Sequence, residues 1–412
     1  MPTEAAPAGK ADLFADDVLH DPYPLYATLR ETAPAVWLEQ HDVWAVTRHA
    51  DVKAALGDPE TFSSVDGLAL TEAANSTIMR GTVLGSDGAD HARLRRPLSR
   101  QLNPRAMRDL VDRVRDRADR LVAGCIGQGC QSERAPLGEQ DFFQGEFDAA
   151  LLAQRFVADI VMELMGLPES TREKLIHGAA ATFDMFGPDN DRFKASAPTA
   201  GAMIEFLYQE VTRESVAPGS WMAAIYAAAD AGELDEADVV PLMSAYTAAG
   251  MDTTIDAISG AIHRLATHPE QWEHLRAGRA DGEDVFRETM RLDAPIQAFG
   301  RRATRDTSID GVPIAAGEQV WLIFGATGRD PRKWGPDAEE FRVRRPDTAD
   351  HLALGYGPHT CAGNHLAALE ARSLLESLAA HCTRLEPAGE PVRTLNNVLH
   401  GWRSVPVRVT AA

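Results

Sequence analysis

The sequence predicts a mainly α-helical fold with a small β-rich region. Over residues 105–180 and 191–228, apolar side chains recur with a helical period, and residues 235–267 form the longest helical candidate. Strand-like alternation is confined to short stretches such as residues 36–47, whose polar centre predicts a hairpin. With 412 residues and 44% apolar content, the chain is long enough to bury a substantial core.

The composition of the chain argues against some classes of binding partner and location. The net charge of −20 argues against general nucleic-acid binding, because phosphate contacts need clustered positive charge. The chain contains no run of 18 apolar residues, and its first residues are acidic and rich in Ala and Pro, unlike a signal peptide. The four cysteines show no disulfide framework at this length. We therefore expect a cytoplasmic protein with no nucleic-acid partner and no membrane association.

The first 83 residues are predicted to form short helices and the hairpin, separated by loops. Residues 1–20 are expected to form a flexible arm. Residues 21–32 predict a short amphipathic helix that ends before Pro34, and residues 50–56 predict a second short helix. Residues 62–83 have mixed polarity and no sustained period, so we expect a mobile loop with one helical turn there.

A helix that starts near residue 87 carries two basic side chains one turn apart. His91 and Arg95 lie on the same face of this helix, a spacing at which two donors can hold one carboxylate, although an ordinary surface pair has the same spacing. Residues 91–120 contain ten arginines and four aspartates, against the acidic trend of the chain. This run is either a solvated helix face or a basic patch for an anionic group or an acidic protein partner.

The middle of the long helical candidate has poor helix propensity. Thr253 and Thr254 are β-branched and follow Gly250 closely. The Thr253 hydroxyl can bond back to the carbonyl group of Ala249, four residues earlier, and Gly250 lets that turn open. We expect a local groove there, in which Asp252 and Thr253 supply an acid and a hydroxyl that can relay protons. A helix kink with satisfied polar groups is the alternative.

One cysteine lies between a glycine-rich loop and the start of a helix. Gly355, Gly357 and Gly363 remove side chains around Cys361, so that a flat and bulky partner could lie against the backbone. From Ala362 onward the pattern is helical, which places Cys361 at a helix N-terminus, where the macrodipole favours a thiolate. An accessible thiolate is the kind of side chain that serves as an axial ligand of iron.

Cys361 could also be a buried apolar residue or a zinc ligand. A lone cysteine is often a small buried hydrophobic residue, although the glycine spacing argues against this. A zinc site with His351, His359 and His365 is disfavoured, because no second cysteine stands at a C-x-x-C spacing. We therefore treat Cys361 as a candidate iron ligand.

These motifs resemble those of the cytochrome P450 monooxygenases. The glycine-rich loop around Cys361 is similar to the haem-binding loop of that family, with Leu354 in place of the usual phenylalanine. Residues 249–254 are similar to the family's oxygen-activating segment. The resemblance implies a cytochrome P450 fold, with one haem-thiolate domain over residues 21–412.

The resemblance also implies haem b (iron protoporphyrin IX) as the cofactor. Cys361 would be the axial ligand of iron, and Asp252 and Thr253 would deliver protons to bound oxygen. Besides Cys361, the implied cofactor-binding residues are His91, Arg95, Ala249, Gly250, Arg301, His359 and Gly363. The arginines and histidines of this set would hold the haem propionates. The implied structural ion-pair network consists of Glu288, Arg291 and Arg345.

Several segments are most similar to bacterial members of this family that demethylate methoxybenzoates. This implies oxidative O-demethylation of a small methoxyaromatic substrate, with release of formaldehyde. The implied substrate contacts are Phe183, Phe186, Ala245, Ala249, Phe299 and Val398. A benzoate carboxylate would need an arginine or several hydroxyl donors, and Arg80 is the nearby loop candidate, whereas a neutral methoxyphenol of the guaiacol type would need neither.

The implied partners are dioxygen, the aromatic substrate and a ferredoxin with its NAD(P)H-dependent reductase. We expect outside electrons because the sequence shows no flavin or ferredoxin segment. The arginine-rich residues 93–117 would then be a docking surface for an acidic ferredoxin, through electrostatic steering. Two alternatives stay open: hydroxylation of another small hydrophobic compound, such as a terpenoid or natural-product intermediate, and a haem sensor or electron carrier without catalysis. The Asp252–Thr253 pair argues against the second alternative, because a sensor or an electron carrier needs no proton delivery to bound oxygen.

Overall fold

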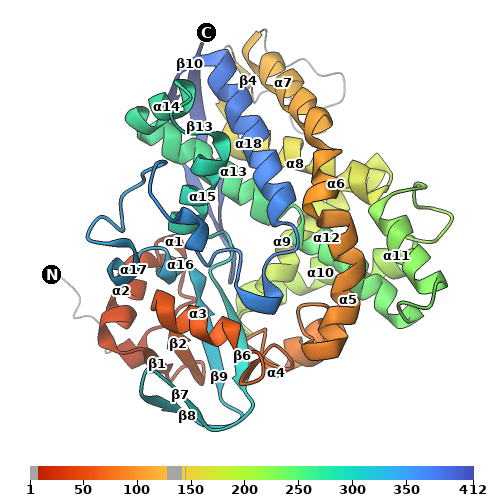
Figure 1. Cartoon of the computed structure of the whole chain (residues 1–412), viewed down its shortest axis with the longest axis vertical. Helices are drawn as coiled ribbons and strands as arrows, with labels where there is room; N and C mark the ends of the chain where they lie inside the picture. The colour runs from red at the N-terminus through yellow and green to blue at the C-terminus, as the bar shows by residue number, and fades with distance from the viewer. Residues whose placement is uncertain (1–7, 128–141, 144) are drawn as a thin grey trace.

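The structure is a computed structural model, which describes residues 8–127, 142–143 and 145–412. Helices make up most of the molecule, and small sheets lie around them (Figure 1). The α-helices of the described residues are α1 (Asp16–His20), α2 (Tyr23–Thr32), α3 (His49–Gly57), α4 (Glu72–Ala74), α5 (Gly88–Leu102), α6 (Pro104–Arg108), α7 (Val111–Gly127), α8 (Ala149–Met165), α9 (Arg172–Asp184), α10 (Asp191–Gln209), α11 (Trp221–Asp230), α12 (Val239–Ala249), α13 (Asp252–Thr267), α14 (Pro269–Arg276), α15 (Gly282–Asp293), α16 (Phe324–Thr327), α17 (Pro331–Trp334) and α18 (Asn364–His381). The predicted mainly α fold with a small β-rich region is confirmed.

The strands of the described residues form four small sheets. Their bounds are β1 (Ala35–Leu38), β2 (Val43–Val46), β3 (Phe62–Ser63), β4 (Phe142–Phe143), β5 (Glu146–Asp148), β6 (Ala298–Ala303), β7 (Thr307–Ile309), β8 (Val312–Ile314), β9 (Gln319–Ile323), β10 (Cys382–Pro387), β11 (Val392–Leu395), β12 (His400–Ser404) and β13 (Pro406–Ala411). The largest sheet has the order β1-β2-β9-β6-β3, and a second sheet has the order β10-β13-β5-β4. The pairs β11–β12 and β7–β8 form the other two sheets.

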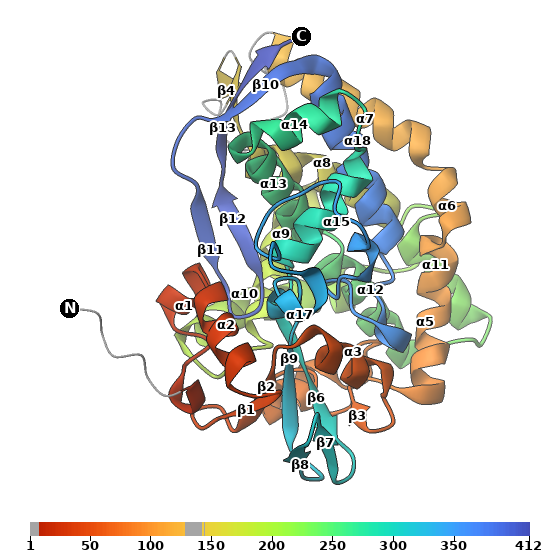
Figure 2. The same cartoon turned by 60° about the vertical axis from the view of Figure 1, so that its left-hand side comes forward.

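Apolar side chains gather into two clusters. The larger cluster joins the helices from α5 to α15 with α18, and the smaller one joins the five-stranded sheet to α2 and α3. In Figure 2 this sheet lies at the lower end of the molecule beside α1–α3, and the helical part stands above it. Helix α13 runs through the helical part, where it packs against α8, α15 and α18. The residues near the middle of α13 are therefore held by helices on several sides.

The predicted hairpin and the two short helices near the N-terminus are confirmed. Strands β1 and β2 pair antiparallel, with Trp37 opposite Trp44, and α2 and α3 stand on either side of the hairpin in the chain. Strand β9 pairs with β2 in parallel, so the sheet joins segments that lie far apart in the sequence. Residues 62–83 contain β3, the short helix α4 and a π-helical turn at Asn75–Met79, so they hold more regular structure than the single turn that we expected.

The expected flexible arm at residues 1–20 needs correction from residue 8 onward. Ala8–Lys10 forms a 3₁₀ turn and Asp16–His20 forms α1. Between them, Leu13 and Phe14 are buried, and the Phe14 ring packs edge-on against Trp321 of β9, with centroids 6.3 Å apart. Two adjacent apolar side chains are enough to anchor this segment, and a prediction from its acidic, Ala-rich composition overlooked them. Residues 1–7 lie outside the described residues.

The long helix predicted over residues 235–267 is two helices. Helix α12 ends at Ala249 and α13 begins at Asp252, so the helix is interrupted at Gly250 and Met251, although both residues keep φ and ψ angles of the right-handed helical region. The predicted back-bond is present, because the Thr253 hydroxyl donates to the Ala249 carbonyl group at 3.0 Å. A Cβ atom at position 250 would stand 2.5 Å from the carbonyl oxygen of Tyr246, which explains the glycine there. The interruption is therefore confined to one turn, between Ala249 and Asp252.

Helix α15 is clamped to the loops that precede the cysteine loop. Arg291 donates from two nitrogens to the two carboxylate oxygens of Glu288, each at 2.7 Å, and Arg345 adds a third donor at 3.2 Å. The Glu288 and Arg291 side chains are both 0% exposed. Arg291 also donates to backbone carbonyl groups of residues 328, 338 and 340. A buried pair with this many hydrogen bonds fixes these loops against α15.

Within the part of the chain that the structure describes, we find no helix with both the length and the apolar character needed to cross a bilayer.

Candidate active site

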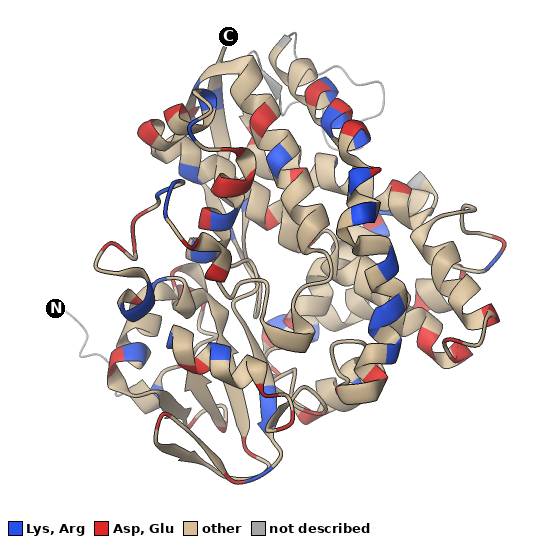
Figure 3. Ribbon diagram, in the orientation of Figure 1, with Lys and Arg blue, Asp and Glu red and all other residues tan. Residues whose placement is uncertain are grey.

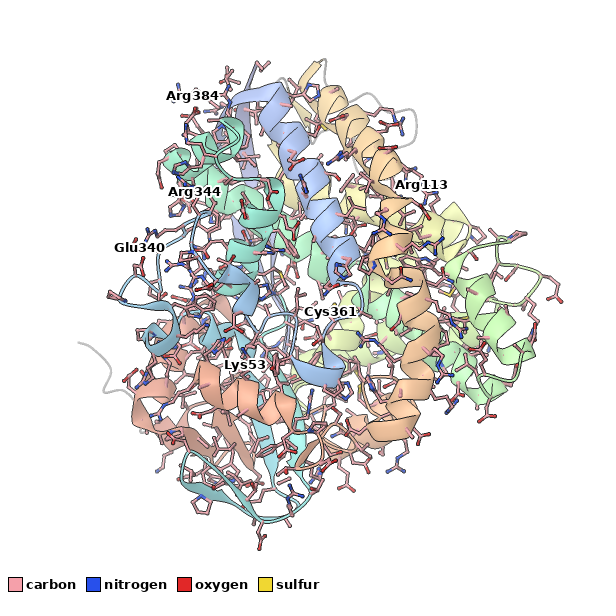
Figure 4. The ribbon with its side chains drawn as sticks, viewed as in Figure 1. Lys53, Arg113, Glu340, Arg344, Cys361 and Arg384 are labelled. Atoms are coloured by element: carbon pink, nitrogen blue, oxygen red, sulfur yellow. The ribbon has the colours of Figure 1, made fainter. Side chains whose placement is uncertain are left out.

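The loop before α18 closes tightly around Cys361. The backbone N–H of Cys361 donates to the Leu354 carbonyl group at 2.8 Å. Gly355 and Gly357 have φ angles of 71° and 72°, and a Cβ atom at Gly357 would stand 2.8 Å from the Leu56 carbonyl oxygen of α3. Glycine at these two positions lets the loop turn and approach α3. Figure 4 shows Cys361 near the N-terminal end of α18.

The Cys361 thiol is subject to opposing electrostatic effects. Burial raises its pKa, whereas backbone hydrogen bonds from Gly363 and Asn364 and the positive charge of Arg95 lower it. Burial prevails, so the pKa lies above the usual value of a thiol. The expected effect of the helix N-terminus is present, since the amides at the start of α18 lower the pKa, but burial outweighs it. The amides and Arg95 stabilise the anion, but a bound metal ion is needed to displace the proton.

Basic side chains from three segments gather beside the cysteine loop. His91 and Arg95 of α5 lie one turn apart, and the His91 ring is 4.3 Å from the His359 ring. His359 Nε2 bonds to the Asp87 carboxylate at 2.8 Å and contacts the Ser64 hydroxyl at 3.3 Å. His91 Nε2 is buried and has no hydrogen-bond partner, and burial lowers the pKa of His91 to about 4. A buried imidazole nitrogen without a partner indicates that a ligand group belongs there.

Two arginines near this cluster have no carboxylate partner. Arg301 of β6 is buried and donates to the carbonyl group of Gly300, its own neighbour, and Arg95 donates to the Thr360 carbonyl group. Neither forms an ion pair with any carboxylate in the described ranges of the chain. Burial lowers the pKa of Arg301 to about 10, with Asp87 as the opposing charge. Burying unpaired guanidinium groups is costly, so the site is built for an anionic partner.

The opening between α12 and α13 exposes polar groups inside the helical part. Ala249 is solvent-exposed although α12 packs against α9, α10 and α11, so space is left beside it. Asp252 Oδ2 is buried without a partner, and burial, together with the charge of Asp256, raises the pKa of Asp252 well above its usual value. The Thr253 hydroxyl lies at the same opening, bonded to Ala249. A buried carboxyl group with a raised pKa and a hydroxyl group thus follow each other in the chain, next to the exposed Ala249.

Three phenylalanines from distant segments form one aromatic group. The ring centroids of Phe183 and Phe186 are 5.6 Å apart, and those of Phe186 and Phe299 are 5.7 Å apart, in edge-to-face arrangements. Val398 is buried in the same apolar cluster, where its carbonyl group accepts from the Gln297 N–H at 2.9 Å. Helix α9, which carries Phe183, packs against α12. The aromatic group therefore lies beside the helix whose end exposes Ala249.

Comparison with known proteins identifies the family of this site. The family model for cytochrome P450 matches residues 283–409. Cytochrome P450 CYP199A2 of Rhodopseudomonas palustris is 33% identical, over 97% of this chain and 94% of the relative. The chain belongs to the cytochrome P450 family. The monooxygenase PikC of Streptomyces venezuelae is 30% identical, over 98% and 95% of the two chains. The crystal structure of CYP108D1 from Novosphingobium aromaticivorans superposes with a TM-score of 0.81 and 25% identity, covering 100% of both chains.

This membership establishes the protein as a cytochrome P450 monooxygenase with haem b, which family members bind through a cysteine thiolate. The observed residues fit that cofactor. Haem b carries two propionates, and the unpartnered His91 nitrogen, Arg95 and Arg301 supply donors without an anion. The zinc alternative finds no support, because the described residues contain no group of three His, Cys, Asp or Glu side chains that could hold a metal ion.

The candidate contact for a substrate carboxylate is not in place. Arg80 is 66% exposed at the surface and bonds to Asp66 at 3.0 and 3.1 Å. The Ser244 hydroxyl of α12 donates to the carbonyl group of Pro241 in its own helix. Ala245 is partly buried against the helical cluster. Among the side chains that we considered for a benzoate, none offers a free cationic donor.

Sequence reasoning missed Asp87 and Ser64. Asp87 precedes α5 and could be mistaken for an ordinary helix cap, yet its side chain makes no capping bond. Its carboxylate instead accepts from the Ser63 hydroxyl at 2.7 Å, from the Ser64 N–H at 2.8 Å and from His359. The hint in the sequence is an aspartate four residues before His91, which a local rule assigns to capping.

We expect an Arg301→Gln substitution to speed haem loss. A charge-assisted hydrogen bond to a propionate contributes about 1.5–3 kcal/mol, so dissociation of haem should become roughly 10- to 100-fold faster. The measurement is haem transfer to an excess of an apo-haemoprotein, followed by absorbance. Arg302→Gln is the matched control, because Arg302 donates to the carbonyl groups of Asp66 and Gly317 instead. Equal rates for the two variants would contradict this role of Arg301.

Proposed function

We propose that this cytochrome P450 is an oxidative O-demethylase of a small methoxyaromatic, with Cys361 as the axial ligand of its haem iron. His91, Arg95 and Arg301 would hold the propionates, with His359 beside them, and the loop residue Gly363 would line the cofactor. The observation that carries the cofactor assignment is the set of buried basic groups without anions next to Cys361. A thiolate-ligated haem that receives electrons activates dioxygen and supports insertion of one oxygen atom into a C–H bond.

In this proposal, Asp252 and Thr253 hold and transfer the protons that oxygen reduction requires. The raised pKa of Asp252 keeps its carboxyl group protonated, so it can donate. The Thr253 hydroxyl gives its own hydrogen to the Ala249 carbonyl group, which leaves its oxygen to accept a hydrogen bond from a water molecule. The exposed position of Ala249, at the end of α12, is where such a water would bind.

The aromatic group supports a planar aromatic substrate. Phe183, Phe186 and Phe299 offer ring edges and faces, and Val398 adds an apolar contact, which suits a small ring better than a flexible chain. Because Arg80 is engaged with Asp66 at the surface, we favour a neutral methoxyphenol of the guaiacol type over a methoxybenzoate. The similarity of several sequence segments to methoxybenzoate-demethylating members of the family supports O-demethylation, whereas the preference for a neutral ring rests on the position of Arg80.

The proposed demethylation needs only dioxygen, electrons and protons. One dioxygen, two electrons and two protons convert the methoxy carbon to a hemiacetal and release one water. The hemiacetal then breaks its C–O bond, which gives formaldehyde and a phenol. No further oxidant is required.

Formaldehyde release tests this function directly. With NADH and a surrogate ferredoxin system, we expect the purified protein to form formaldehyde from guaiacol in proportion to the phenol product. Binding spectra should show displacement of the iron-bound water by guaiacol and a weaker response to 4-methoxybenzoate. Absence of formaldehyde with every methoxyphenol and methoxybenzoate offered would refute demethylation. A stronger response to the benzoate would refute the preference for neutral rings.

The two electrons would come from a ferredoxin with an NAD(P)H-dependent reductase, as is general for redox partners of bacterial relatives. Helices α6 and α7 pack against α18, the helix that follows Cys361, so a protein bound on them is close to the sulfur. Figure 3 shows Lys and Arg along α5, α6 and α7. Part of this charge is neutralised, since Arg93 pairs with Asp238 and Arg113 with Glu163. On α5, α6 and α7, the exposed arginines for which the structure gives no ion pair among the described residues are Arg96, Arg105, Arg108, Arg115 and Arg120.

We expect the double substitution Arg105→Glu and Arg108→Glu to slow electron transfer from an acidic ferredoxin. Attraction between opposite charges raises association rates at low salt, so the loss should be largest there and shrink as salt is added. Stopped-flow reduction of the haem at several salt concentrations measures it. Arg384→Glu, on β10 and paired with Glu386, is the control and should leave the rate unchanged. A double variant that matches the parent at low salt would rule out this surface.

A further inference from the structure

A second carboxyl group lies one turn after Asp252 on α13. Asp256 follows Asp252 by four residues, a spacing that puts two side chains about 5–6 Å apart at their Cβ atoms. Its carboxylate lies directly over the backbone of β12, because a Cβ atom at Gly401 would stand 1.9 Å from Asp256 Oδ1. Glycine at 401 is therefore what makes room for the Asp256 side chain.

Charged and polar groups from β11, β12 and α13 act on this pair. From β11, Arg393 acts on Asp256 at long range, while its guanidinium group stacks 3.3 Å from the Trp402 ring centroid. From β12, the Trp402 backbone N–H donates to the Asp256 carboxylate. From α13 itself, the charge of Asp256 raises the pKa of Asp252. No cation within hydrogen-bond or ion-pair distance of either carboxylate is found among the described residues.

Two carboxyl groups in such surroundings hold a proton between them. Losing the first proton from the pair is easy compared with losing the second, because two buried negative charges repel each other. The pKa shifts have the expected direction: burial raises the pKa of Asp256 to about 7, and burial together with the charge of Asp256 raises the pKa of Asp252 well above its usual value. Near neutral pH, the pair therefore retains at least one proton.

We propose that Asp256 is a positioning residue for Asp252, whose negative charge keeps Asp252 in the protonated form from which a proton is donated at the α12–α13 opening. This inference rests on the proton-donor role given to Asp252 in the proposed function. The Asp256 side chain faces β12, so Asp256 acts on the site only through Asp252. The result is an acid whose proton affinity is set by a second acid and not by a basic partner.

An Asp256→Asn substitution separates charge from structure. The asparagine side chain is nearly the same size, and its oxygen can still accept the Trp402 N–H, so the β12 contact is preserved. The charge is lost, and the repulsion that holds the proton on Asp252 is lost with it. A purely structural role for Asp256 would leave the titration of Asp252 unchanged.

Infrared spectroscopy of the substrate-free ferric holoenzyme measures that titration. The carbonyl stretching band of protonated carboxyl groups is followed against pH in the parent, in Asp256→Asn and in Asp252→Asn, which identifies the Asp252 contribution. We expect Asp256→Asn to lower the apparent pKa of Asp252 by about one unit or more, since coupled sites differ by at least that much. Asp252→Asn should leave the pKa of Asp256 nearly unchanged, because Asp256 ionises while the Asp252 carboxyl group is still protonated and uncharged.

Asp51→Asn is the control for this experiment. Asp51 of α3 is also a carboxyl group whose pKa is raised by burial and by a neighbouring aspartate, Asp310, but it lies on another element. Its removal should take away its own band and leave Asp252 unshifted. An unshifted Asp252 in Asp256→Asn would overturn the inference, whether or not guaiacol is demethylated. A shifted Asp252 in a protein that releases no formaldehyde would uphold it and refute the substrate.

Discussion

The structure depends on holding one sulfur atom at the start of α18 while the backbone around it closes without side chains. Gly357 lets the loop approach Leu56 of α3, and the amides of Gly363 and Asn364 point at the sulfur. On the other side, the buried Glu288–Arg291–Arg345 network ties α15 to the loops before the cysteine. A loop fixed at both ends in this way presents its cysteine in one position.

The charges around this loop are unbalanced within the chain. Burial opposes ionisation of Cys361, and it also disfavours the positive forms of His91 and Arg301. Each group would be stabilised by a partner of the opposite kind, a cation for the thiolate and anions for the basic side chains. A single cofactor with a central metal ion and two carboxylates satisfies all of them. This explains why the site gathers groups that the protein alone leaves without partners.

Features set by neighbours in the sequence were predictable. The Thr253 back-bond to Ala249 follows from a spacing of four residues, and the Glu288–Arg291 pair follows from a spacing of three. The hairpin at 35–46 follows from alternation around a polar turn. The family resemblance extended this local reasoning to Arg345, which the structure also places on Glu288.

Features that depend on distant contacts or on opposing effects were not predictable. Arg80 turns outward because Asp66 is near it in space, and Phe14 is buried because β9 passes beside it. The pKa of Cys361 is the outcome of burial against hydrogen bonds, and the helix position alone could not show that burial has the larger effect. The role of Asp256 depends on Gly401, which arrives from the C-terminal strands.

The carbon monoxide spectrum of the reduced protein tests the central assignment most directly. If the Cys361 sulfur ligates the haem iron, the parent protein and a Cys382→Ala control will show the strongly red-shifted Soret band of a thiolate adduct, and Cys361→Ala will lack it. A Cys361→Ala variant that keeps this band, or a parent protein without it, would contradict the account.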